Sequence, residues 1–225
     1  MFEITKLEVN RNPFIGLYFT ASDNALLYAP SIPEKTMRLA EQILKPKKIS
    51  RSNIAHFHLV GLFSVMNSNG ILLPDFCEEA ERKKIETDLE LRSTLIDDRF
   101  SALRNNIIAN DNGALVNGDM THEEIRKIQD CLDVEVVKMH MGPVKTIGAM
   151  SVSTNNGALL FNGVAGSEAE LVEKVLKVKV TRGTTNLGAI ANSYGVVANR
   201  HGALVGSLSS GFEVAGVYEA LSGGE

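Results

Sequence analysis

A short pattern built on Asn-Gly returns five times along this chain at a nearly constant spacing. In chain order the copies read SDNALLY, NSNGILL, NDNGALV, TNNGALL and NRHGALV. Their turn residues, spaced 46, 43, 44 and 45 positions apart, are Asn24, Gly70, Gly113, Gly157 and Gly202. So steady a period indicates a repeat architecture, in which one structural unit recurs and each copy packs on its neighbours.

Each copy is expected to form a tight hairpin between two strands. Asn69-Gly70, Asn112-Gly113 and Asn156-Gly157 are dipeptides favoured by a two-residue type I′ turn, in which both residues have positive φ. Asp23-Asn24 and His201-Gly202 are weaker versions, because Asp, Asn and His enter the left-handed region more readily than most residues. Apolar runs such as VGLFSVM before the turn and ILL after it are typical of strands.

A helix-start signal follows each turn, in which a capping residue stands three positions before a Glu. The five pairs are Ser31/Glu34, Asp75/Glu78, Thr121/Glu124, Ser167/Glu170 and Ser210/Glu213. Apolar residues then recur with helical spacing, as in Ile125, Ile128 and Leu132. DVEVVKM and KVKVT predict a further strand after the third and fourth helices. The unit is therefore strand, turn, strand, helix and strand, and it occurs five times.

The fifth unit lacks its last strand, because the chain ends with LSGGE soon after the fifth helix signal. The N-terminal FEITKLEV alternates like a strand and has no place in unit one. We expect residues 2–9 to complete unit five and close the array into a ring without exposed sheet edges, with helices outside and strands inside. The chain is then one domain, 1–225. Its units span approximately 10–55, 56–99, 100–144, 145–182 and 183–225.

One irregularity affects unit five. Gly188 precedes the marker Gly202 by 14 residues, whereas Gly16, Gly61 and Gly148 precede their markers by 8, 9 and 9. Either ANSYG is an insertion, or the first strand of unit five starts elsewhere.

The composition is that of a soluble globular protein, with 44% hydrophobic and 22% charged residues. A net charge of −4 argues against a cationic protein that coats nucleic acid. No apolar run reaches the roughly 18–20 residues that cross a bilayer, and the N-terminus lacks the apolar core of a signal peptide. Two cysteines without an export signal indicate a reducing compartment. We therefore expect a cytoplasmic protein with no membrane contact.

Five-fold repetition of this kind defines the pentein architecture. In detail, the amino-acid sequence resembles the archaeal and eukaryotic translation initiation factor 6 family. The stretches most specific to the family are VGLFSVMNSNG (60–70), GILLP (70–74), RFSALRNNIIANDNGALV (99–116) and LDVEVV (132–137). VTRGTTNLGA (180–189) is similar to the fifth-repeat segment of the family but matches it less well. These matches keep their order across the units and cover nearly the whole chain. The resemblance therefore implies an α/β fold, a five-fold pseudosymmetric closed ring or α/β propeller.

The resemblance also implies a function that composition does not show. Factors of this family bind the large ribosomal subunit at the face that meets the small subunit, and they block subunit joining sterically. They contact a ribosomal protein near the sarcin–ricin loop, and a release factor removes them together with a GTPase similar to elongation factor 2. Such a role needs no catalysis, no cofactor and no metal, and we expect a monomer in solution.

Several residues correspond to family contacts. The family segment ALGN matches ALRN here, so its ribosome-contacting Asn is Asn105 and its Gly is replaced by Arg104, which adds bulk and charge. A family Arg that follows a Gly in unit two falls on Leu62, which removes a charge. A family Gly important for binding matches Gly16.

The repeat relates these positions to one another. The equivalent pairs are Gly16/Leu17, Gly61/Leu62 and Arg104/Asn105. By pseudosymmetry they share one rim of the ring, and we assign the ribosome-binding site to Gly16, Leu17, Leu62, Arg104 and Asn105.

Three other features each allow a functional and a structural interpretation, and the structural one is favoured. His56 and His58 fall on one face of a predicted strand at metal-compatible spacing, but no third ligand is in view. The basic stretch KPKKISR, residues 45–51, can contact rRNA phosphates or form a solvated loop. Cys77 is expected in the first turn of helix two, where a helix N-terminus lowers a thiol pKa, or it is simply a packed thiol.

Two rival classes of function remain. Other penteins modify guanidines through a Cys nucleophile in the last unit. This chain has no Cys after Cys131, so unit five has no such nucleophile. A structural assembly subunit is the third class, and it predicts stable self-association in place of ribosome binding.

Overall fold

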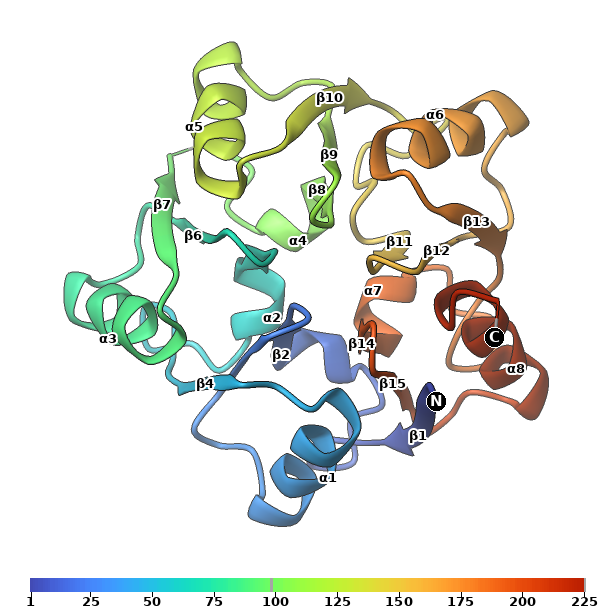
Figure 1. Cartoon of the computed structure of the whole chain (residues 1–225), viewed down its shortest axis with the longest axis horizontal. Helices are drawn as coiled ribbons and strands as arrows, with labels where there is room; N and C mark the ends of the chain where they lie inside the picture. The colour runs from blue at the N-terminus through green and yellow to red at the C-terminus, as the bar shows by residue number, and fades with distance from the viewer. Residues whose placement is uncertain (98, 225) are drawn as a thin grey trace.

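Five three-stranded sheets stand around a common axis in the computed structural model, which describes residues 1–97 and 99–224 (Figure 1). Each sheet joins an antiparallel hairpin to a third strand that runs parallel to the second. The sheets are β2 (Phe19–Ala21), β3 (Ala25–Tyr28) and β4 (Lys48–Arg51); β5 (Val65–Met66), β6 (Gly70–Pro74) and β7 (Arg92–Ile96); β8 (Ile107–Ala109), β9 (Gly113–Asn117) and β10 (Glu135–Met139); β11 (Ser151–Ser153), β12 (Gly157–Leu160) and β13 (Lys179–Arg182); and β14 (Val196–Asn199), β15 (Gly202–Gly206) and β1 (Glu3–Leu7).

A helix of 11 residues follows the second strand of each unit, and in units one to four it leads to the third, parallel strand, as parallel pairing requires a crossover. The five helices are α1 (Glu34–Leu44), α3 (Glu79–Leu89), α5 (His122–Leu132), α6 (Gly166–Leu176) and α8 (Gly211–Leu221). They lie on the outside of the ring, with the strands inside (Figure 1). The predicted five-fold α/β ring with outer helices is confirmed.

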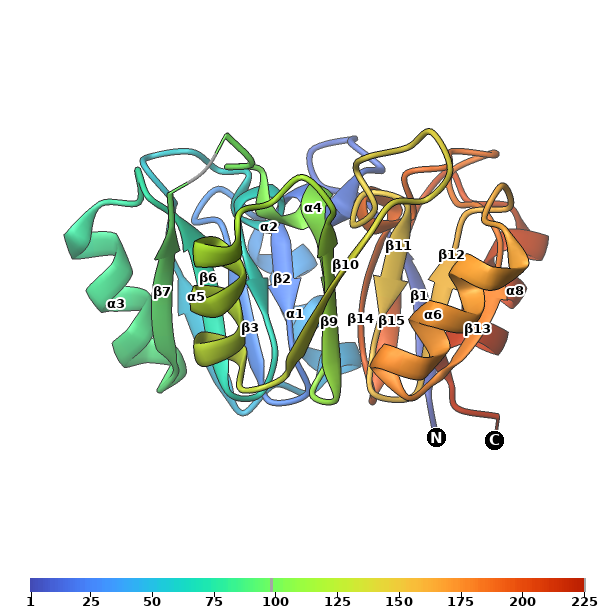
Figure 2. The same cartoon turned by 90° about the horizontal axis from the view of Figure 1, so that it is seen from above.

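Short helical turns precede the first strand in most units. They are η1 (Ile15–Leu17), α2 (Val60–Phe63), α4 (Leu103–Asn106) and α7 (Asn192–Gly195), with a turn at residues 147–150 in unit four. Figure 2 shows that these segments gather at one end of the ring and the hairpin loops at the other. We call the five segments together the helical rim.

The N-terminal strand closes the ring. β1 pairs in parallel with β15, from Glu3 with Gly202 to Leu7 with Gly206, and supplies the third strand of unit five. The sheets of neighbouring units do not join by strand hydrogen bonds, however, because each remains a separate sheet of three strands. The ring therefore closes by packing between units and not by removal of sheet edges.

Each outer helix packs between two units and contributes apolar residues to the core there. α5 contacts β6 and β7 of unit two as well as β10 of its own unit. Its residues Ile128 and Leu132, on the predicted helical face, are fully buried with Leu72 and Ile96 of unit two. Full burial of one such side chain stabilises the fold by about 1.5–3 kcal/mol.

The Asn-Gly loops are not type I′ turns, so that prediction is wrong. Among the described residues, positive φ values do not occur at Asn69-Gly70 or at the equivalent loop positions. The Oδ1 atom of Asn67 folds the loop instead, by accepting hydrogen bonds from the backbone N–H groups of Asn69 (2.9 Å) and Gly70 (3.1 Å). This side-chain turn satisfies the backbone without a left-handed residue.

Glycine begins these second strands because the neighbouring helix comes close. A Cβ atom on Gly70 would lie 2.3 Å from the carbonyl oxygen of Cys131, and one on Gly157 would lie 1.8 Å from that of Ala220. Both distances are far below van der Waals contact. Glycine is therefore needed for close approach and not for backbone conformation.

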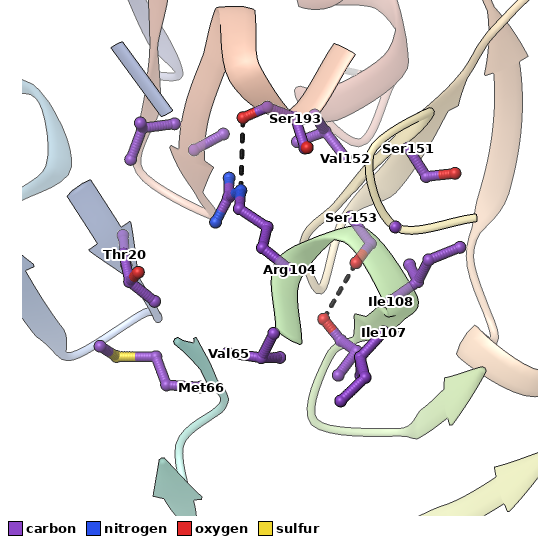
Figure 3. Close-up of a pocket in the computed structure, with 15 residues that line it drawn as sticks. Thr20, Val65, Met66, Arg104, Ile107, Ile108, Ser151, Val152, Ser153 and Ser193 are labelled. Carbon is purple, nitrogen blue, oxygen red and sulfur yellow. Dashed lines mark hydrogen bonds between the residues drawn. The ribbon is translucent and has the colours of Figure 1, made fainter. Parts of the chain in front are cut away.

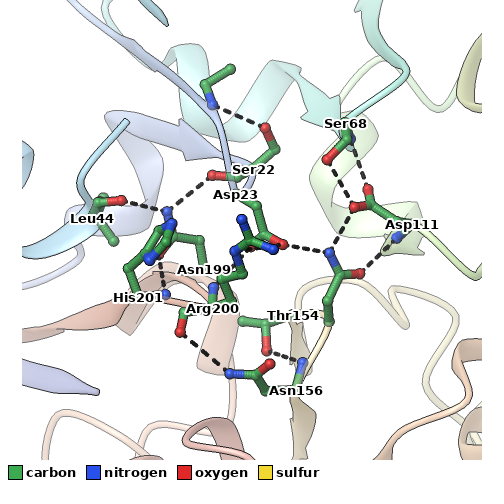
Figure 4. Close-up of polar contacts among 12 residues, drawn as sticks. Ser22, Asp23, Leu44, Ser68, Asp111, Thr154, Asn156, Asn199, Arg200 and His201 are labelled. Atoms are coloured by element: carbon green, nitrogen blue, oxygen red, sulfur yellow. Dashed lines mark hydrogen bonds and ion pairs between the residues drawn. The ribbon is translucent and has the colours of Figure 1, made fainter. Parts of the chain in front are cut away.

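The loop Asn residues also connect one unit to the next. The Nδ2 atom of Asn67 donates to the carbonyl oxygen of Leu132 at the end of α5, at 2.8 Å. Equivalent bonds run from Asn110 to Leu176 (2.9 Å) and from Asn199 to Leu44 (2.7 Å; Figure 4). Because the last carbonyl groups of a helix lack partners within it, each Asn caps the helix of the following unit. We call these three residues the staple asparagines.

Pairs of residues with left-handed backbone conformation occur at the helical-rim end of the ring, opposite the hairpin loops. They are Asn10-Arg11, Ala55-His56 and Asn186-Leu187, each inside a small bridge that follows a third strand. Sequence patterns for type I′ turns missed them, because none is an Asn-Gly or Asp-Gly dipeptide.

The structure decides between the two alternatives for unit five in favour of the second, because the first strand of that unit, β14, starts at Val196 and not near Gly188. The backbone N–H of Ser193 donates to the carbonyl of Ala149 (3.1 Å), as that of Gly148 donates to Asn105 (2.9 Å). Ser193, and not Gly188, is thus the counterpart of Gly148, and NSYG (Asn192–Gly195) forms α7. Counted to the first residue of the second strand, the spacing is nine residues in every unit, which makes Ala25 and not Asn24 the marker of unit one.

Two of the five predicted helix caps are confirmed. Thr121 and Ser210 accept hydrogen bonds from the backbone N–H groups of Glu124 and Glu213, each at 3.2 Å. The other three predictions, Ser31, Asp75 and Ser167, are wrong by two or three residues. Those helices begin after Pro33, Glu78 and Ala165. All five helices have the same length, which indicates that packing against the sheets decides their ends.

The single-domain interpretation and the five unit boundaries stay predictions. No helix within the described ranges has the length and apolar character needed to span a membrane.

Candidate functional site

The predicted binding residues lie on the helical rim. Gly16 and Leu17 belong to η1, Leu62 to α2, and Arg104 and Asn105 to α4. These segments share one end of the ring (Figure 2), but their side chains do not all face solvent.

Gly16 is a packing residue. It is buried, and a Cβ atom there would lie 1.9 Å from the carbonyl oxygen of Ser193. The next unit repeats the contact, since a Cβ on Gly61 would lie 2.1 Å from the carbonyl oxygen of Gly16. The half-buried side chains of Leu17 and Leu62 therefore form the surface at these positions.

Arg104 turns its side chain inward, toward the axis of the ring (Figure 3). Its Nε atom donates to the carbonyl oxygen of Ser193 and its Nη2 atom to that of Val196, both at 3.3 Å. Burial of the guanidinium lowers its pKa to about 10, against a smaller opposite effect of Tyr194. The group stays charged at neutral pH, so the replacement of the family Gly adds a charge inside the ring.

Asn105 forms a hydrogen bond to unit five through the oxygen atom of its side-chain amide. The hydroxyl of Tyr194 donates to its Oδ1 atom at 2.6 Å. Within the part of the chain that the structure describes, its Nδ2 atom has no hydrogen-bond partner. Sequence analysis missed Tyr194, although the nine-residue spacing makes it the counterpart of Asn105.

Exposed apolar side chains flank the rim. Phe57 is 55% exposed and lies 5.7 Å from Phe63, which contacts Phe76 edge-on at 5.5 Å between ring centroids. On unit five, Leu187 is 71% exposed and Phe212 is 89% exposed. Large exposed apolar side chains that gather near one face are typical of protein contact surfaces.

Carboxylates near the starts of the outer helices hold the rim loops. Glu213 accepts backbone hydrogen bonds from Ser210 (2.7 Å), Gly188 (2.8 Å) and Leu187 (3.2 Å), and one from the Thr184 hydroxyl. Burial acts to raise the pKa of this carboxyl, but the donors together lower it to about 2. Glu213 is thus an anionic anchor for the unit-five side of the rim.

His56 and His58 do not form the predicted strand pair. His56 lies in a left-handed turn, and its Nε2 atom is 2.8 Å from Glu78. With Glu81 these groups form a cluster of three possible metal ligands, so carboxylates supply the ligand that the sequence pattern lacked. The cluster is largely exposed, however, and Glu81 already accepts backbone N–H groups from residues 55 and 56.

The remaining sequence candidates have structural roles. Cys77 precedes α3 and is not in its first turn. Burial, with Glu81 acting in the same direction, raises its thiol pKa to about 12, which is the opposite of activation. Burial also raises the pKa of Cys131.

In the basic stretch 45–51, residues 45–47 form the loop after α1 and Lys48–Arg51 form strand β4, so the predicted loop is correct for the first three residues and wrong for the last four. Lys45 bonds to Glu3 at 2.7 Å and Lys48 to Glu90. These ion pairs occupy two of its cationic groups.

A cluster of polar groups closes the hairpin end of the ring (Figure 4). The Nδ2 atom of Asn155 donates to Asp23 and to Asp111, each at 2.7 Å. Asp111 also accepts from Ser68, and Asp23 lies 3.7 Å from the Nε atom of Arg200. We call these five residues the central polar cluster, and they connect units one, two, three, four and five.

The sequence model of the eIF-6 family matches residues 4–220. The chain is 34% identical over 223 residues to translation initiation factor 6 of Thermococcus onnurineus (strain NA1), covering 97% of each chain. It is 32% identical over 220 residues to translation initiation factor 6 of Thermoplasma acidophilum, covering 97% of this chain and 100% of that relative.

Among solved structures, the chain is similar to DDAH from Pseudomonas aeruginosa, a mutant in complex with citrulline. The TM-score is 0.51 at 11% identity, over 75% of this chain and 68% of the other. Similarity at this identity concerns the fold alone, and it supports the pentein architecture.

Proposed function

Because the chain belongs to the eIF-6 family, we propose that it is a translation initiation factor that binds the large ribosomal subunit at its inter-subunit face. It thereby prevents premature association with the small subunit, during initiation or during maturation of the large subunit. The observation that carries this proposal is the family match over residues 4–220, which includes every segment of the helical rim.

The helical rim is the proposed contact surface. Leu17 and Leu62 offer apolar side chains, and Asn105 offers an amide N–H₂ group that no described residue uses. Such a donor suits a backbone carbonyl or a polar group on the partner. Gly16 and Arg104 contribute indirectly, because Gly16 allows close packing of units one and five and Arg104 crosses to unit five.

The chemistry of the rim favours a protein partner over bare rRNA. The chain carries a net charge of −4, whereas rRNA contacts depend on Lys and Arg that neutralise phosphates. The apolar side chains Phe57, Leu187 and Phe212 near the rim suit a protein surface. We therefore propose contact with a ribosomal protein near the sarcin–ricin loop, and later displacement by a release factor with an elongation-factor-2-like GTPase in the cytoplasm.

Occupancy is sufficient for this mechanism. Five units packed around one axis make a rigid body, and a rigid body on the inter-subunit face blocks the small subunit without chemistry. An enzyme of the guanidine-modifying pentein type is disfavoured, because unit five contains no Cys and both thiols elsewhere are buried.

Sedimentation with purified ribosomal subunits tests the proposal. The protein should sediment with the large subunit and not with the small one, and its addition should reduce the fraction of joined subunits. Binding to neither subunit, or equal binding to both, would contradict the proposal. A double variant of the opposite end, Ser68→Ala with Asn156→Ala, is the matched control and should bind normally.

A further inference from the structure

A cavity of about 60 Å³ lies on the axis of the ring near the helical rim (Figure 3). Its walls are the innermost strands of all five units, β2, β5, β8, β11 and β14, together with Arg104, Gly148 and Ser193. One water molecule needs roughly 10–15 Å³. The cavity is therefore large enough for a small ion with accompanying water, and its volume is too small for a substrate of metabolite size.

The guanidinium of Arg104 brings a positive charge to this cavity. A guanidinium carries five N–H donors, and two of those of Arg104 reach backbone carbonyl groups, at Ser193 and Val196. Among residues 1–97 and 99–224, it forms no ion pair. The residue is half-buried, and a guanidinium that is partly withdrawn from water without a counter-charge is unfavourable. Since its pKa of about 10 keeps the group protonated at neutral pH, the rim end of the axis carries a positive charge that attracts an anion.

Ser193 supplies a second, independent donor. The residue is 2% exposed and lines the cavity, and its hydroxyl has no hydrogen-bond partner in the described part of the chain. A buried hydroxyl without a partner is rare in folded proteins. The hydroxyl hydrogen rotates freely to face an acceptor.

The carboxylates near the axis do not compensate Arg104. Asp23 and Asp111 lie in the central polar cluster at the hairpin end, and neither lines this cavity. Asp23 already faces Arg200, and Asp111 accepts hydrogen bonds from Ser68 and Asn155. The rim end of the axis thus holds donors and a positive charge without an acceptor of opposite charge.

We propose that the axial cavity binds one small monovalent anion of the halide class, held by the Arg104 guanidinium and the Ser193 hydroxyl. The anion neutralises the charge of Arg104 and joins α4 of unit three to α7 of unit five. This site uses the side chain of Arg104, which contributes only indirectly to the proposed ribosome contact. The volume favours a monatomic ion such as chloride over phosphate.

Crystals grown with sodium bromide as the only halide give a direct test. An anomalous bromide peak in the cavity, at hydrogen-bond distance from Arg104 and Ser193, is the expected result. A cavity that refines with water alone at saturating bromide would overturn the proposal.

Thermal unfolding gives a second test that does not depend on crystals. At constant ionic strength, replacement of sodium gluconate by sodium chloride should raise the Tm by about 3–6 °C once chloride reaches ten times its Kd. Gluconate is too large for the cavity. Arg104→Met should abolish the chloride effect and Ser193→Ala should reduce it, whereas Arg38→Met, which removes an exposed charge on α1, should keep it.

Two outcomes of the unfolding test would contradict the site. One is a wild-type Tm that is the same in both salts. The other is an Arg104→Met variant that responds to chloride as the wild type does. If Arg104→Met does not fold, the Ser193→Ala response and the bromide map decide between an anion and water.

Discussion

The hydroxyl of Tyr194 donates a 2.6 Å hydrogen bond to the Oδ1 atom of Asn105, although the two residues are 89 positions apart. They occupy equivalent positions in units five and three, and the bond spans the ring at its helical rim. It leaves the Asn105 N–H₂ group available to a partner, and this defines a test of the proposed contact surface.

Asn105→Ala should weaken binding to the large subunit by about 1–3 kcal/mol, because a desolvated group on the partner loses its donor. Tyr194→Phe is the matched control, since it removes only the internal bond and should cost at most about 0.5–1.5 kcal/mol of stability. Binding by sedimentation and unfolding by urea are measured on both variants. A large stability loss with intact binding in Asn105→Ala would show that this residue only closes a local contact.

Asn110→Ala should lower the free energy of unfolding by about 1–3 kcal/mol, because it removes the hydrogen bonds to the carbonyl oxygens of Leu176 and Thr154 and leaves Asn112 as the remaining donor to Leu176. Units one and four carry Ser22 and Thr154 at the staple position, and these accept loop N–H groups without donating to the next helix. Thr154→Asn should therefore add the missing bond and stabilise the protein by about 0.5–1.5 kcal/mol. A neutral Asn110→Ala in urea unfolding would argue against the staple role.

Gly157→Ala should destabilise the ring by about 1–3 kcal/mol or more, because its Cβ would overlap the Ala220 carbonyl oxygen at 1.8 Å. Gly216→Ala is the matched control inside α8, where a Cβ meets nothing within 4 Å. It should stabilise the helix by about 0.8–1.0 kcal/mol. Equal effects of the two substitutions on chemical unfolding would rule out close approach as the reason for the repeated glycine.

The carboxyl of Glu213 should make the free energy of unfolding depend on pH in the acidic range. Its folded pKa is lowered from 4.5 to about 2, so its contribution is present above the unfolded value and is lost as pH falls from about 5 to 2. The contribution is of order 3 kcal/mol, at 1.36 kcal/mol per pKa unit. Glu213→Gln should flatten the stability profile over this range, and an unchanged acid limb would contradict the assignment.

Unfolding should be a single cooperative transition, because every outer helix packs on two units and β1 completes the last sheet. Removal of residues 1–8 should abolish folding of the whole ring, since β15 then loses its parallel partner β1 and keeps only β14. Coincident transitions by far-ultraviolet circular dichroism and by calorimetry are the measurement. Two resolved transitions would instead divide the chain into independent parts.

The sequence by itself determined the unit, its number and the closure of the ring. These features are local or periodic: an apolar pattern identifies each strand and helix, and the constant spacing counts the units. The N-terminal strand, which had no place in unit one, could then fill only one position, that of the missing third strand in the fifth sheet. The resemblance carried by residues 60–74 and 99–137 also pointed to the right family.

Only the tertiary structure decided how the units contact one another. The Asn-Gly loops predicted a type I′ turn from local preference, yet Asn67 folds its loop with its own side chain and donates to Leu132, 65 positions away. Glycine is required at position 70 because the backbone of the next unit comes too close for a Cβ atom, and not because of the φ angle of Gly70. Arg104 turns inward because unit five presents carbonyl groups there. Such contacts depend on which faces meet after folding, and the period of a repeat does not contain that information.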